Sequence, residues 1–377
     1  MFRNLITTII LSVVSASGMC SEANELSTQV DSIFEKFNAP NVPGCAVGVI
    51  HDGQYVVAKG YGSANLEHGI PIDADSVFRI GSVSKQFTAL AIAILANRGD
   101  LDLDADVHTY LPDLRDYGVE VTIRQMLHHT SGIGEYEGTN TYKISGDKEF
   151  RFGNEDYWTI AEFYQQVTQQ PLALAPGERF QYSNIAYFLL SQVVESVSGQ
   201  TLRQFAATEI FAPLKMNATF FNDNVDGIVP HRADGYTPLD EGGFEIYVTN
   251  LDWVGDGGVY TSLNDFLKWD TAFMTGNVPG GEKVQTMMID PDPLTLKTLG
   301  DENSFAEHNA YGFGLVIADY KGHAIQFHTG SWVGFRAFYA RFPDDDFSVV
   351  SFCNRADAGK NKNNETLLEL AFSEFAK

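Results

Sequence analysis

Strand patterns at both ends of this 377-residue chain constrain its fold more than any other feature. Near the start, Cys45–Ile50 and Tyr55–Gly60 are rich in β-branched and aromatic residues, and Asp52-Gly53 between them is a strong hairpin signal. Near the end, four further runs predict successive strands separated by short turns. These runs are Tyr311–Ala318, Ala324–His328, Phe335–Phe342 and Phe347–Cys353.

Helix patterns occupy most of the remaining chain, with polar or Gly-rich turns between them. They lie at Glu25–Phe37, Phe87–Leu95, Thr122–Leu127, Thr159–Gln169, Ile185–Val197, Leu263–Met274 and Asn364–Phe375. Because the strands at the two ends need a common core, we expect the first and last strands to meet in one sheet. The predicted fold is α/β (α+β), a central antiparallel sheet flanked by helices with an inserted helical region.

Two of the three cysteines, Cys45 and Cys353, lie in strand patterns at opposite ends of the chain. They can form a disulfide only if these strands are neighbours and the compartment is oxidising. Two separate buried thiols fit the sequence equally well, so the pairing stays open.

The first residues have the layout of a secretory signal peptide. Arg3 precedes the apolar run Leu5–Val14, which small residues follow and which is too short for a permanent membrane anchor. We therefore expect residues 1–23 to be a signal peptide and residues 24–377 to form one mature hydrolase domain. The candidate cleavage points follow Ser17, Gly18 and Ala23.

The expected location is periplasmic or secreted. Cys20 fits the position of a lipidated cysteine, but Met19 before it is a poor residue for that cleavage, so lipidation is not expected. No other stretch is long and apolar enough to cross a membrane, so stable membrane insertion is not expected either. A formal net charge of -24, spread along the chain, disfavours nucleic acid and anionic membranes as partners. The oligomeric state is not predicted.

The stretch that carries most chemical information surrounds Ser82, at the start of an apolar helix. Lys85 lies three residues on, so both side chains leave the same helix face about one turn apart. A lysine in the first turn opposes the helix dipole, where Asp or Glu is stabilising. The same field favours the neutral amine, which can act as a base toward a serine nucleophile.

An N-capping Ser82 with a solvated Lys85 is the plainer interpretation of an isolated S-x-x-K pattern. Ser145 and Lys148 repeat the pattern in a polar, Gly-flanked loop without an apolar helix. Only the Ser82 copy has a helix context that supports catalysis. The segment Gly134–Asn154 is expected to be a long loop of the kind that lines or covers sites.

Two further motifs follow in chain order. Tyr182 and Asn184 lie two residues apart in an irregular stretch before an apolar helix. A packed tyrosine and an N-capping asparagine would also explain this pair. The second motif is the run His328-Thr329-Gly330-Ser331 at the end of a predicted strand.

These three motifs, in this order, resemble those of the serine β-lactamase and penicillin-binding-protein family. More narrowly, the chain is similar to the branch of class C β-lactamases, D-alanyl-D-alanine carboxypeptidases, D-aminopeptidases and β-lactamase-like esterases. Each motif alone is weak, but three in order, in helix, loop and strand contexts, are specific. The resemblance covers roughly the whole mature chain and implies a β-lactamase/transpeptidase-like fold.

The resemblance implies a role for each residue. Ser82 attacks a carbonyl and becomes acylated, and Lys85 takes its proton or holds the charge of the site. Tyr182, acidified by Lys85, shuttles protons to the leaving group. Asn184 positions the amide side of the substrate and helps to fix Lys85. The backbone N–H groups of Ser82 and Ser331 form the oxyanion hole.

The third motif departs from many family members, which have lysine where this chain has His328. Thr329 and Gly330, which follow His328, match the family motif. Histidine is largely neutral near pH 7, so this position does not supply a permanent cation for a substrate carboxylate. This favours a D-alanyl carboxypeptidase, D-aminopeptidase or esterase acting on small peptides, amides or esters. A class C-like β-lactamase and a non-catalytic peptidoglycan or β-lactam sensor are the alternatives. No cofactor is implied, and no spacing fits a metal site.

Overall fold

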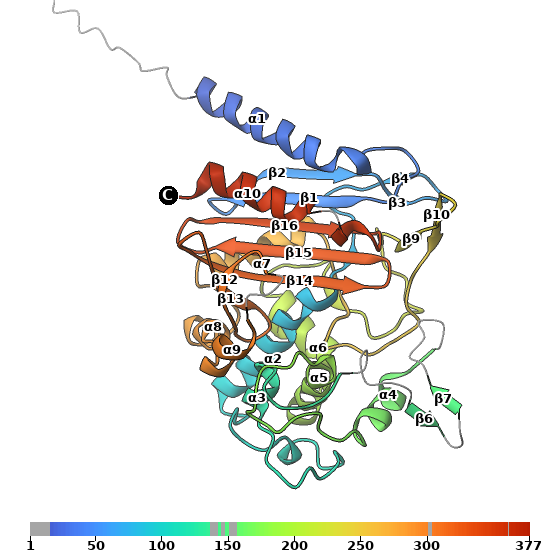
Figure 1. The fold of residues 1–377 in the computed structure, drawn as a ribbon, viewed down its shortest axis with the longest axis vertical. Coiled ribbons are helices and arrows are strands. Elements are labelled where there is room, and N and C mark those ends of the chain that lie inside the picture. Colours follow the sequence, from blue (N-terminus) through green and yellow to red (C-terminus); the bar gives the residue numbers. More distant parts are fainter. Residues whose placement is uncertain (1–15, 136–141, 145–147, 151–156, 301–303, 361) are drawn as a thin grey trace, which may run out of the picture.

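The computed structural model describes residues 16–135, 142–144, 148–150, 157–300, 304–360 and 362–377. A seven-stranded antiparallel sheet forms its centre, in the order β12-β13-β14-β15-β16-β1-β2 (Figure 1). Its strands are β1 (Cys45–His51), β2 (Gln54–Tyr61), β12 (Glu307–Tyr311), β13 (Val316–Tyr320), β14 (His323–Trp332), β15 (Phe335–Phe342) and β16 (Phe347–Cys353). The first strand pairs with the last, as the sequence predicts, because β1 lies between β2 and β16.

Two strand predictions differ from the structure. The run Tyr311–Ala318, predicted as one strand, is divided between β12 and β13. Gly314 between them has a φ of 77°, and a Cβ there would lie 2.6 Å from the Lys85 carbonyl, so close packing fixes the turn. The run predicted at Ala324–His328 continues to Trp332, which lengthens β14.

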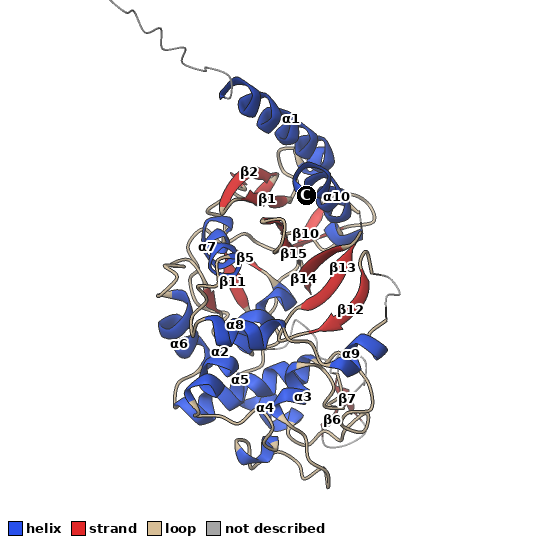
Figure 2. Cartoon of the chain, turned by 90° about the vertical axis from the view of Figure 1, so that its left-hand side faces the viewer, coloured by secondary structure: helices blue, strands red, loops and turns tan. Residues whose placement is uncertain are grey.

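Helices cover both faces of the sheet (Figures 1 and 2). On one face, α10 (Asn363–Phe375) contacts β16 and α1 (Ala16–Phe34) contacts β2. On the other face, α7 (Leu263–Met274) contacts β1 and β2. The expected arrangement of a central sheet between helices is therefore confirmed.

Side chains alternate between these faces along β1, as in any strand. Val47 and Val49 enter the apolar core beneath α1 and α10. Ala46 and Ile50 join the core that continues into the helical region. A shift of one residue in register would exchange the two sets, so burial on both faces specifies the pairing.

The helical region is built around α2 (Lys85–Arg98), which follows a 3-10 turn at Gly81–Ser84. Residues 85–95 are all buried, as expected for a helix inside a core. The helix ends at Gly99, whose left-handed backbone, with a φ of 81°, caps it. The remaining helices are α3 (Ile123–Leu127), α4 (Ile160–Val167), α5 (Asn184–Ser198), α6 (Leu202–Ala206), α8 (Glu282–Ile289) and α9 (Pro293–Thr298).

Short strands complete the fold. A three-stranded sheet in the order β5-β11-β8 places β5 directly before the 3-10 turn. The segment Gly134–Asn154, predicted as a loop, contains the paired strands β6 and β7, and its other residues from 136 onward lie outside the described part. These strands are β3 (Ser63–Asn65), β4 (Ile70–Pro71), β5 (Phe78–Arg79), β6 (Tyr142–Ile144), β7 (Lys148–Phe150), β8 (Phe220–Phe221), β9 (Tyr236–Pro238), β10 (Phe244–Ile246) and β11 (Val259–Thr261).

The N-terminal helix is longer than predicted. The helix expected at Glu25–Phe37 begins at Ala16, and its last residues form a 3-10 turn at Glu35–Phe37. Residues 1–15 lie outside the described residues, so the signal peptide stays a prediction. Among the residues described, no helix has both the length and the apolar character that a bilayer span requires.

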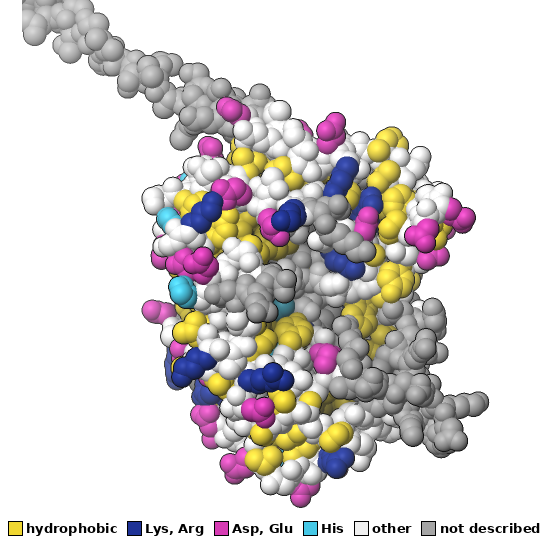
Figure 3. All heavy atoms as spheres, in the orientation of Figure 1, with side chains coloured by type: hydrophobic (Ala, Val, Ile, Leu, Met, Phe, Trp, Pro, Cys, Tyr) yellow, Lys and Arg dark blue, Asp and Glu magenta, His cyan; other side chains and the backbone are white. Residues whose placement is uncertain are grey.

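Charged side chains are spread over the surface. On the face in Figure 3, acidic side chains occur singly or in small groups, with basic residues among them. This distribution fits solvation of the whole molecule rather than a localised acidic site.

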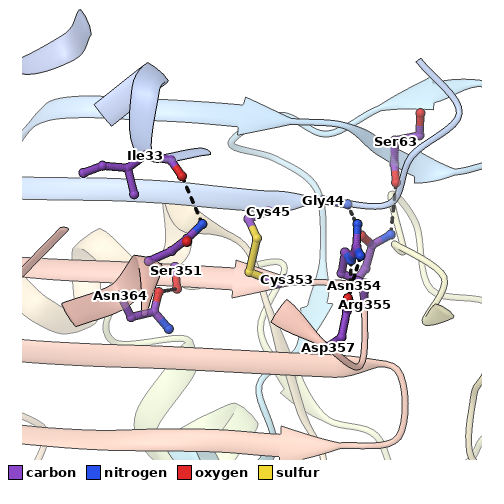
Figure 4. Close-up of a disulfide and its surroundings, with 11 residues drawn as sticks. Ile33, Gly44, Cys45, Ser63, Ser351, Cys353, Asn354, Arg355, Asp357 and Asn364 are labelled. Carbon is purple, nitrogen blue, oxygen red and sulfur yellow. Dashed lines mark hydrogen bonds and ion pairs between the residues drawn. A yellow bond between two sulfur atoms is a disulfide. The ribbon is translucent and has the colours of Figure 1, made fainter. Parts of the chain in front are cut away.

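A disulfide joins Cys45 of β1 to Cys353 of β16 (Figure 4). The two residues are direct partners in the ladder, with Cα atoms 4.0 Å apart, so the structure decides between a bridge and two thiols. Next to the bridge, Asn354 accepts a hydrogen bond from the Gly44 N–H at 2.7 Å and donates one to the Ser63 carbonyl at 3.0 Å. The end of the chain is thus tied to its beginning by covalent and polar contacts.

We predict that the double variant Cys45→Ala/Cys353→Ala has a lower melting temperature than the native protein. The bridge spans 308 residues of sequence, so its loss frees the unfolded chain and costs about 2–5 kcal/mol. Thermal unfolding with and without reductant measures the effect. The double variant itself should not respond to reductant, and equal melting temperatures for the native protein and the double variant would contradict the prediction.

Candidate active site

Ser82 lies in the 3-10 turn that enters α2, at a point where the sheet approaches the helical region. Gly81 before it has a φ of 52°, and a Cβ there would lie 2.7 Å from the backbone nitrogen of Ser331. Glycine is therefore required at position 81, both for its conformation and for the close approach of β14. The approach brings the backbone nitrogen of Ser331 close to the turn that carries Ser82.

Lys85 is fully buried at the start of α2, three residues after Ser82. Its Nζ donates hydrogen bonds to Asn184 Oδ1 at 2.6 Å and to the Asp256 carbonyl at 2.5 Å, and it lies 3.3 Å from Ser82 Oγ. A buried amine needs such partners, because desolvation without them is costly. The solvated Lys85 of the plainer interpretation is thus excluded by its burial.

The glycine run that follows Trp253 supplies one of these partners. A Cβ at Gly255 would lie 2.5 Å from the Tyr187 carbonyl, so this segment packs directly on α5. The Gly255 carbonyl accepts a hydrogen bond from Thr88 of α2 at 2.7 Å. This close backbone packing brings the Asp256 carbonyl to Lys85.

Tyr182 lies over Lys85, with the amine 4.8 Å from its ring centroid. Its hydroxyl is buried and makes no hydrogen bond of normal geometry to a described residue. Burial raises the pKa of the phenol well above its usual range, although the nearby Ser82 hydroxyl acts in the opposite direction. The expectation that Lys85 acidifies Tyr182 is therefore wrong, and the resting phenol carries its proton.

His129 holds the segment that carries Tyr182, a role that the sequence did not reveal. Its ring lies 4.3 Å from the Tyr182 ring, and its Nδ1 accepts a hydrogen bond from the Ser183 N–H at 3.1 Å. Its backbone is left-handed, with a φ of 58°. Burial, followed by the charges of Lys85 and His328, lowers the pKa of His129 well below its usual value. The residue is therefore a neutral packing element.

His328 is buried behind the site rather than facing substrate. Its Nδ1 contacts the Thr329 carbonyl at 2.5 Å and its Nε2 contacts the Tyr311 hydroxyl at 2.9 Å. Since a carbonyl only accepts, Nδ1 donates to it and Nε2 accepts from Tyr311. Burial, and then the charge of Lys85, lowers the pKa of His328 to about 4. The histidine of the third motif is therefore neutral near pH 7.

The other residues of the third motif take different positions. Gly330 packs so closely that a Cβ would lie 2.1 Å from the Ile80 carbonyl. The Thr329 side chain is exposed and lines a separate cavity of about 490 Å³, which does not include Ser82. β13 pairs with β14 only up to Phe327, so it leaves this part of the β14 edge beside Gly81 uncovered.

A cavity of about 300 Å³ opens at Ser82. Of the residues that the sequence singled out, it brings together four, namely Ser82, Tyr182, Asn184 and Ser331. His328, Thr329 and Gly330 do not line this cavity, and Lys85 lies beneath it. Among the residues described, no group of three or more His, Cys, Asp or Glu side chains could hold a metal ion.

Three charged residues that the sequence analysis did not assign to the site line the cavity, namely Arg79, Glu135 and Asp256. Glu135 lines the cavity, and its Oε2 accepts a hydrogen bond from the backbone N–H of Asn184 at 2.6 Å. Arg79 lines it as well and is only 4% exposed. Only their positions in the sequence could have indicated a place in the site. Arg79 lies three residues before Ser82, and Glu135 follows the glycines after α3.

Comparison with known proteins gives consistent matches across the chain. The model of the Beta-lactamase family matches residues 30–372. A D-aminopeptidase of Gluconobacter oxydans is 27% identical over 325 residues, which cover 84% of this chain and 57% of that protein. Penicillin-binding protein 4* of Bacillus subtilis is 26% identical over 349 residues, which cover 87% of this chain and 72% of that protein. The chain thus spans little more than half the length of the D-aminopeptidase.

Solved structures show the same fold. An octameric penicillin-binding protein homologue from Pyrococcus abyssi has a TM-score of 0.73 at 25% identity, covering 96% of this chain and 79% of that one. D-amino acid amidase from Ochrobactrum anthropi SV3 has a TM-score of 0.72 at 20% identity, covering 93% and 99%. The predicted β-lactamase/transpeptidase-like fold is therefore confirmed.

We predict that His328 makes stability fall as the pH drops from about 6.5 to about 4. The unfolded chain binds a proton at this histidine near its ordinary pKa of 6.5, whereas the folded chain binds it only near pH 4. The difference amounts to about 3 kcal/mol. Urea unfolding of native protein and His328→Asn between pH 4 and 7 measures it. The variant should lose this part of the pH dependence, exposed His68→Asn should keep it, and equal slopes for native protein and His328→Asn would contradict the assignment.

Proposed function

Because the chain belongs to the Beta-lactamase family, we propose that it is a serine hydrolase that cleaves small amides through an acyl-enzyme on Ser82. The observation that carries this proposal is the hydrogen bonding of Lys85. Asn184 and the Asp256 carbonyl accept from its Nζ at 2.6 and 2.5 Å, while Ser82 Oγ lies at 3.3 Å. In this proposal Lys85 acts as the base after it has lost a proton: its two N–H groups then donate to the two close acceptors, and its lone pair is left for Ser82 Oγ, the third partner of Nζ.

Acylation follows from this arrangement. Ser82 Oγ attacks the substrate carbonyl carbon as its proton moves to Lys85 Nζ, and the N–H groups of Ser82 and Ser331 stabilise the oxyanion. The C–N bond then breaks, and the leaving nitrogen takes the proton of the Tyr182 hydroxyl, which Lys85 restores. The raised pKa of Tyr182 suits a group that donates a proton rather than one that starts as a base.

Water completes the cycle. Its attack on the ester of Ser82 releases the carboxylic acid, and the proton that it loses returns to the serine oxygen through Tyr182 and Lys85. The net reaction is hydrolysis of one amide bond, and the chain's own residues supply every proton transfer. The cavity of about 300 Å³ suits a small substrate.

The charges of the cavity favour D-aminopeptidase-like activity over carboxypeptidase or β-lactamase activity. His328 is neutral, so β14 offers no cation to the carboxylate that a carboxypeptidase or β-lactamase substrate carries on its leaving side. The Glu135 carboxylate instead offers a partner for the ammonium group of an amino-acid residue. A relative with sequence similarity along most of this chain is a D-aminopeptidase.

We further propose that the mature protein is exported and works outside the cytoplasm. The disulfide between Cys45 and Cys353 supports this location, because such bridges persist in oxidising compartments. The predicted signal peptide at residues 1–23 provides the route. N-terminal sequencing of the protein recovered from the producing cell tests both the export and the cleavage point.

We predict that mixing the protein with a D-alanyl p-nitrophenyl ester gives an alanyl adduct on Ser82, detected by intact-mass spectrometry under rapid quench. Ser82→Ala should form no adduct and lose at least about a thousandfold in kcat. Ser373→Ala, on the exposed side of α10, is the matched control and should keep its activity. Turnover by Ser82→Ala at the native rate would refute the mechanism.

The same measurement with a penicillin separates the alternatives. A lasting adduct would indicate a slowly deacylating, peptidase-like site, and rapid consumption of the drug would favour a β-lactamase. A protein that forms an adduct with neither compound would have to be a binding protein.

We predict that Glu135→Gln lowers kcat/KM for D-alanine p-nitroanilide about 10- to 100-fold, which is the range for a charge-assisted hydrogen bond. N-acetyl-D-alanine p-nitroanilide lacks the ammonium group, and its hydrolysis should change little. Glutamine keeps an oxygen that can accept from the Asn184 N–H, so the loop should stay in place. Equal losses on both substrates would show that Glu135 acts only through structure.

A further inference from the structure

Arg79 is a buried cation whose hydrogen-bonding capacity is largely unused. It ends β5, where it pairs with Tyr260 of β11, and its side chain lines the cavity at Ser82. Only 4% of the residue is exposed, yet Nε and Nη1 have no hydrogen-bond partner among the residues described. Its guanidinium carbon lies 5.5 Å from the centroid of the Trp332 ring.

A buried guanidinium group with unpaired N–H donors lowers the stability of the fold unless a ligand binds to it. Taking a cation out of water is unfavourable when its donors stay unpaired, and buried polar groups without partners are rare in native proteins. The contact with Trp332 holds the guanidinium group but does not satisfy its N–H groups, since those point outward in the guanidinium plane. Both atoms are enclosed, so the side chain must turn slightly for them to face the cavity, where a planar anion would satisfy Nε and one terminal nitrogen together.

We propose that Arg79 binds the carboxylate of the substrate's leaving group, so that the preferred substrate is a small zwitterionic peptide such as a dipeptide with a D-residue at its N-terminus. This inference rests on the proposed function and deepens it. In a dipeptide, the ammonium belongs to the acyl residue and the carboxylate to the leaving residue. Glu135 and Arg79 then bind its two ends while Ser82 attacks the single amide between them.

The size and chemistry of the cavity fit this substrate. Two extended residues span at most about 7 Å. A molecule of this length can be held in a cavity of about 300 Å³. The strand that carries the third motif cannot supply the cation, because both nitrogens of His328 are engaged and the ring is neutral. Arg79 offers a fork of donors, which matches a carboxylate better than a single ammonium does.

The test compares D-alanyl-D-alanine with its C-terminal amide, which differs only in the charge at the leaving end. Native protein should hydrolyse the dipeptide with the higher kcat/KM. In Arg79→Gln the preference should fall about 10- to 100-fold, with the loss confined to the dipeptide. Arg79→Lys should retain part of it, because it keeps the charge and loses the fork. Equal losses on both compounds, or no preference in native protein, would overturn the inference.

Binding to Ser82→Ala protein, measured by calorimetry, separates this inference from the proposed function. This protein should bind the dipeptide more tightly than the amide, and Ser82→Ala/Arg79→Gln should bind both alike. If native protein hydrolyses neither compound but this difference appears, the proposed function fails and the carboxylate site stands. If both are hydrolysed and Ser82→Ala shows no difference, the carboxylate site fails and the proposed function stands.

Controls exclude loss of structure as the cause. Arg203→Gln removes an arginine that is paired with Asp223 outside the cavity, and it should leave both kcat/KM values unchanged. Melting temperatures show whether each variant folds. If Arg79→Gln does not fold, Arg79→Lys decides: an unchanged preference for the dipeptide in that variant would overturn the inference.

Discussion

The burial of Lys85 is the constraint on which the active site depends. An amine removed from water must find acceptors, and these come from the Asn184 side chain and the Asp256 carbonyl. The three partners belong to α2, to the start of α5 and to the glycine run before α7. One desolvated group therefore fixes the relative positions of three segments that are far apart in sequence. Ser82, one turn away, inherits its position from them.

The third motif carries no charge in this protein, and the charged residues of the cavity come from other elements. His328 is buried, neutral and committed to Tyr311 and the Thr329 carbonyl, so it supports β14 without presenting a charge. The charged residues that line the cavity are instead Glu135, Arg79 and Asp256. In the proposed function, residues of the cavity wall bind the charged ends of the substrate, and the backbone of β14 binds the oxyanion. Selectivity can then differ from that of a protein with lysine in this strand, although the fold is shared.

Much of this structure follows from local patterns in the sequence. The helix Leu263–Met274 and the strand Phe335–Phe342 have the predicted boundaries, because their periodicity and turn residues agree with the final packing. The meeting of the first and last strands also followed from the need for one core. The division of Tyr311–Ala318 did not, since it depends on how closely Gly314 approaches α2. Choosing between a disulfide and two thiols needed the register that pairs Cys45 with Cys353.

The sequence predicts those site residues whose contact follows from their spacing along one element. It does not predict residues that reach the site only through tertiary packing. Ser82 and Lys85 meet because a helix turn brings them together, a relation that the sequence states directly. Glu135 reaches the cavity only because its loop packs at the start of α5, and Arg79 only because β5 pairs with β11. Neither contact is marked by a periodic pattern in the sequence. A charged residue that enters a site from a separate element leaves no local pattern in the sequence, so the charged residues of the cavity wall are identified only from the three-dimensional structure.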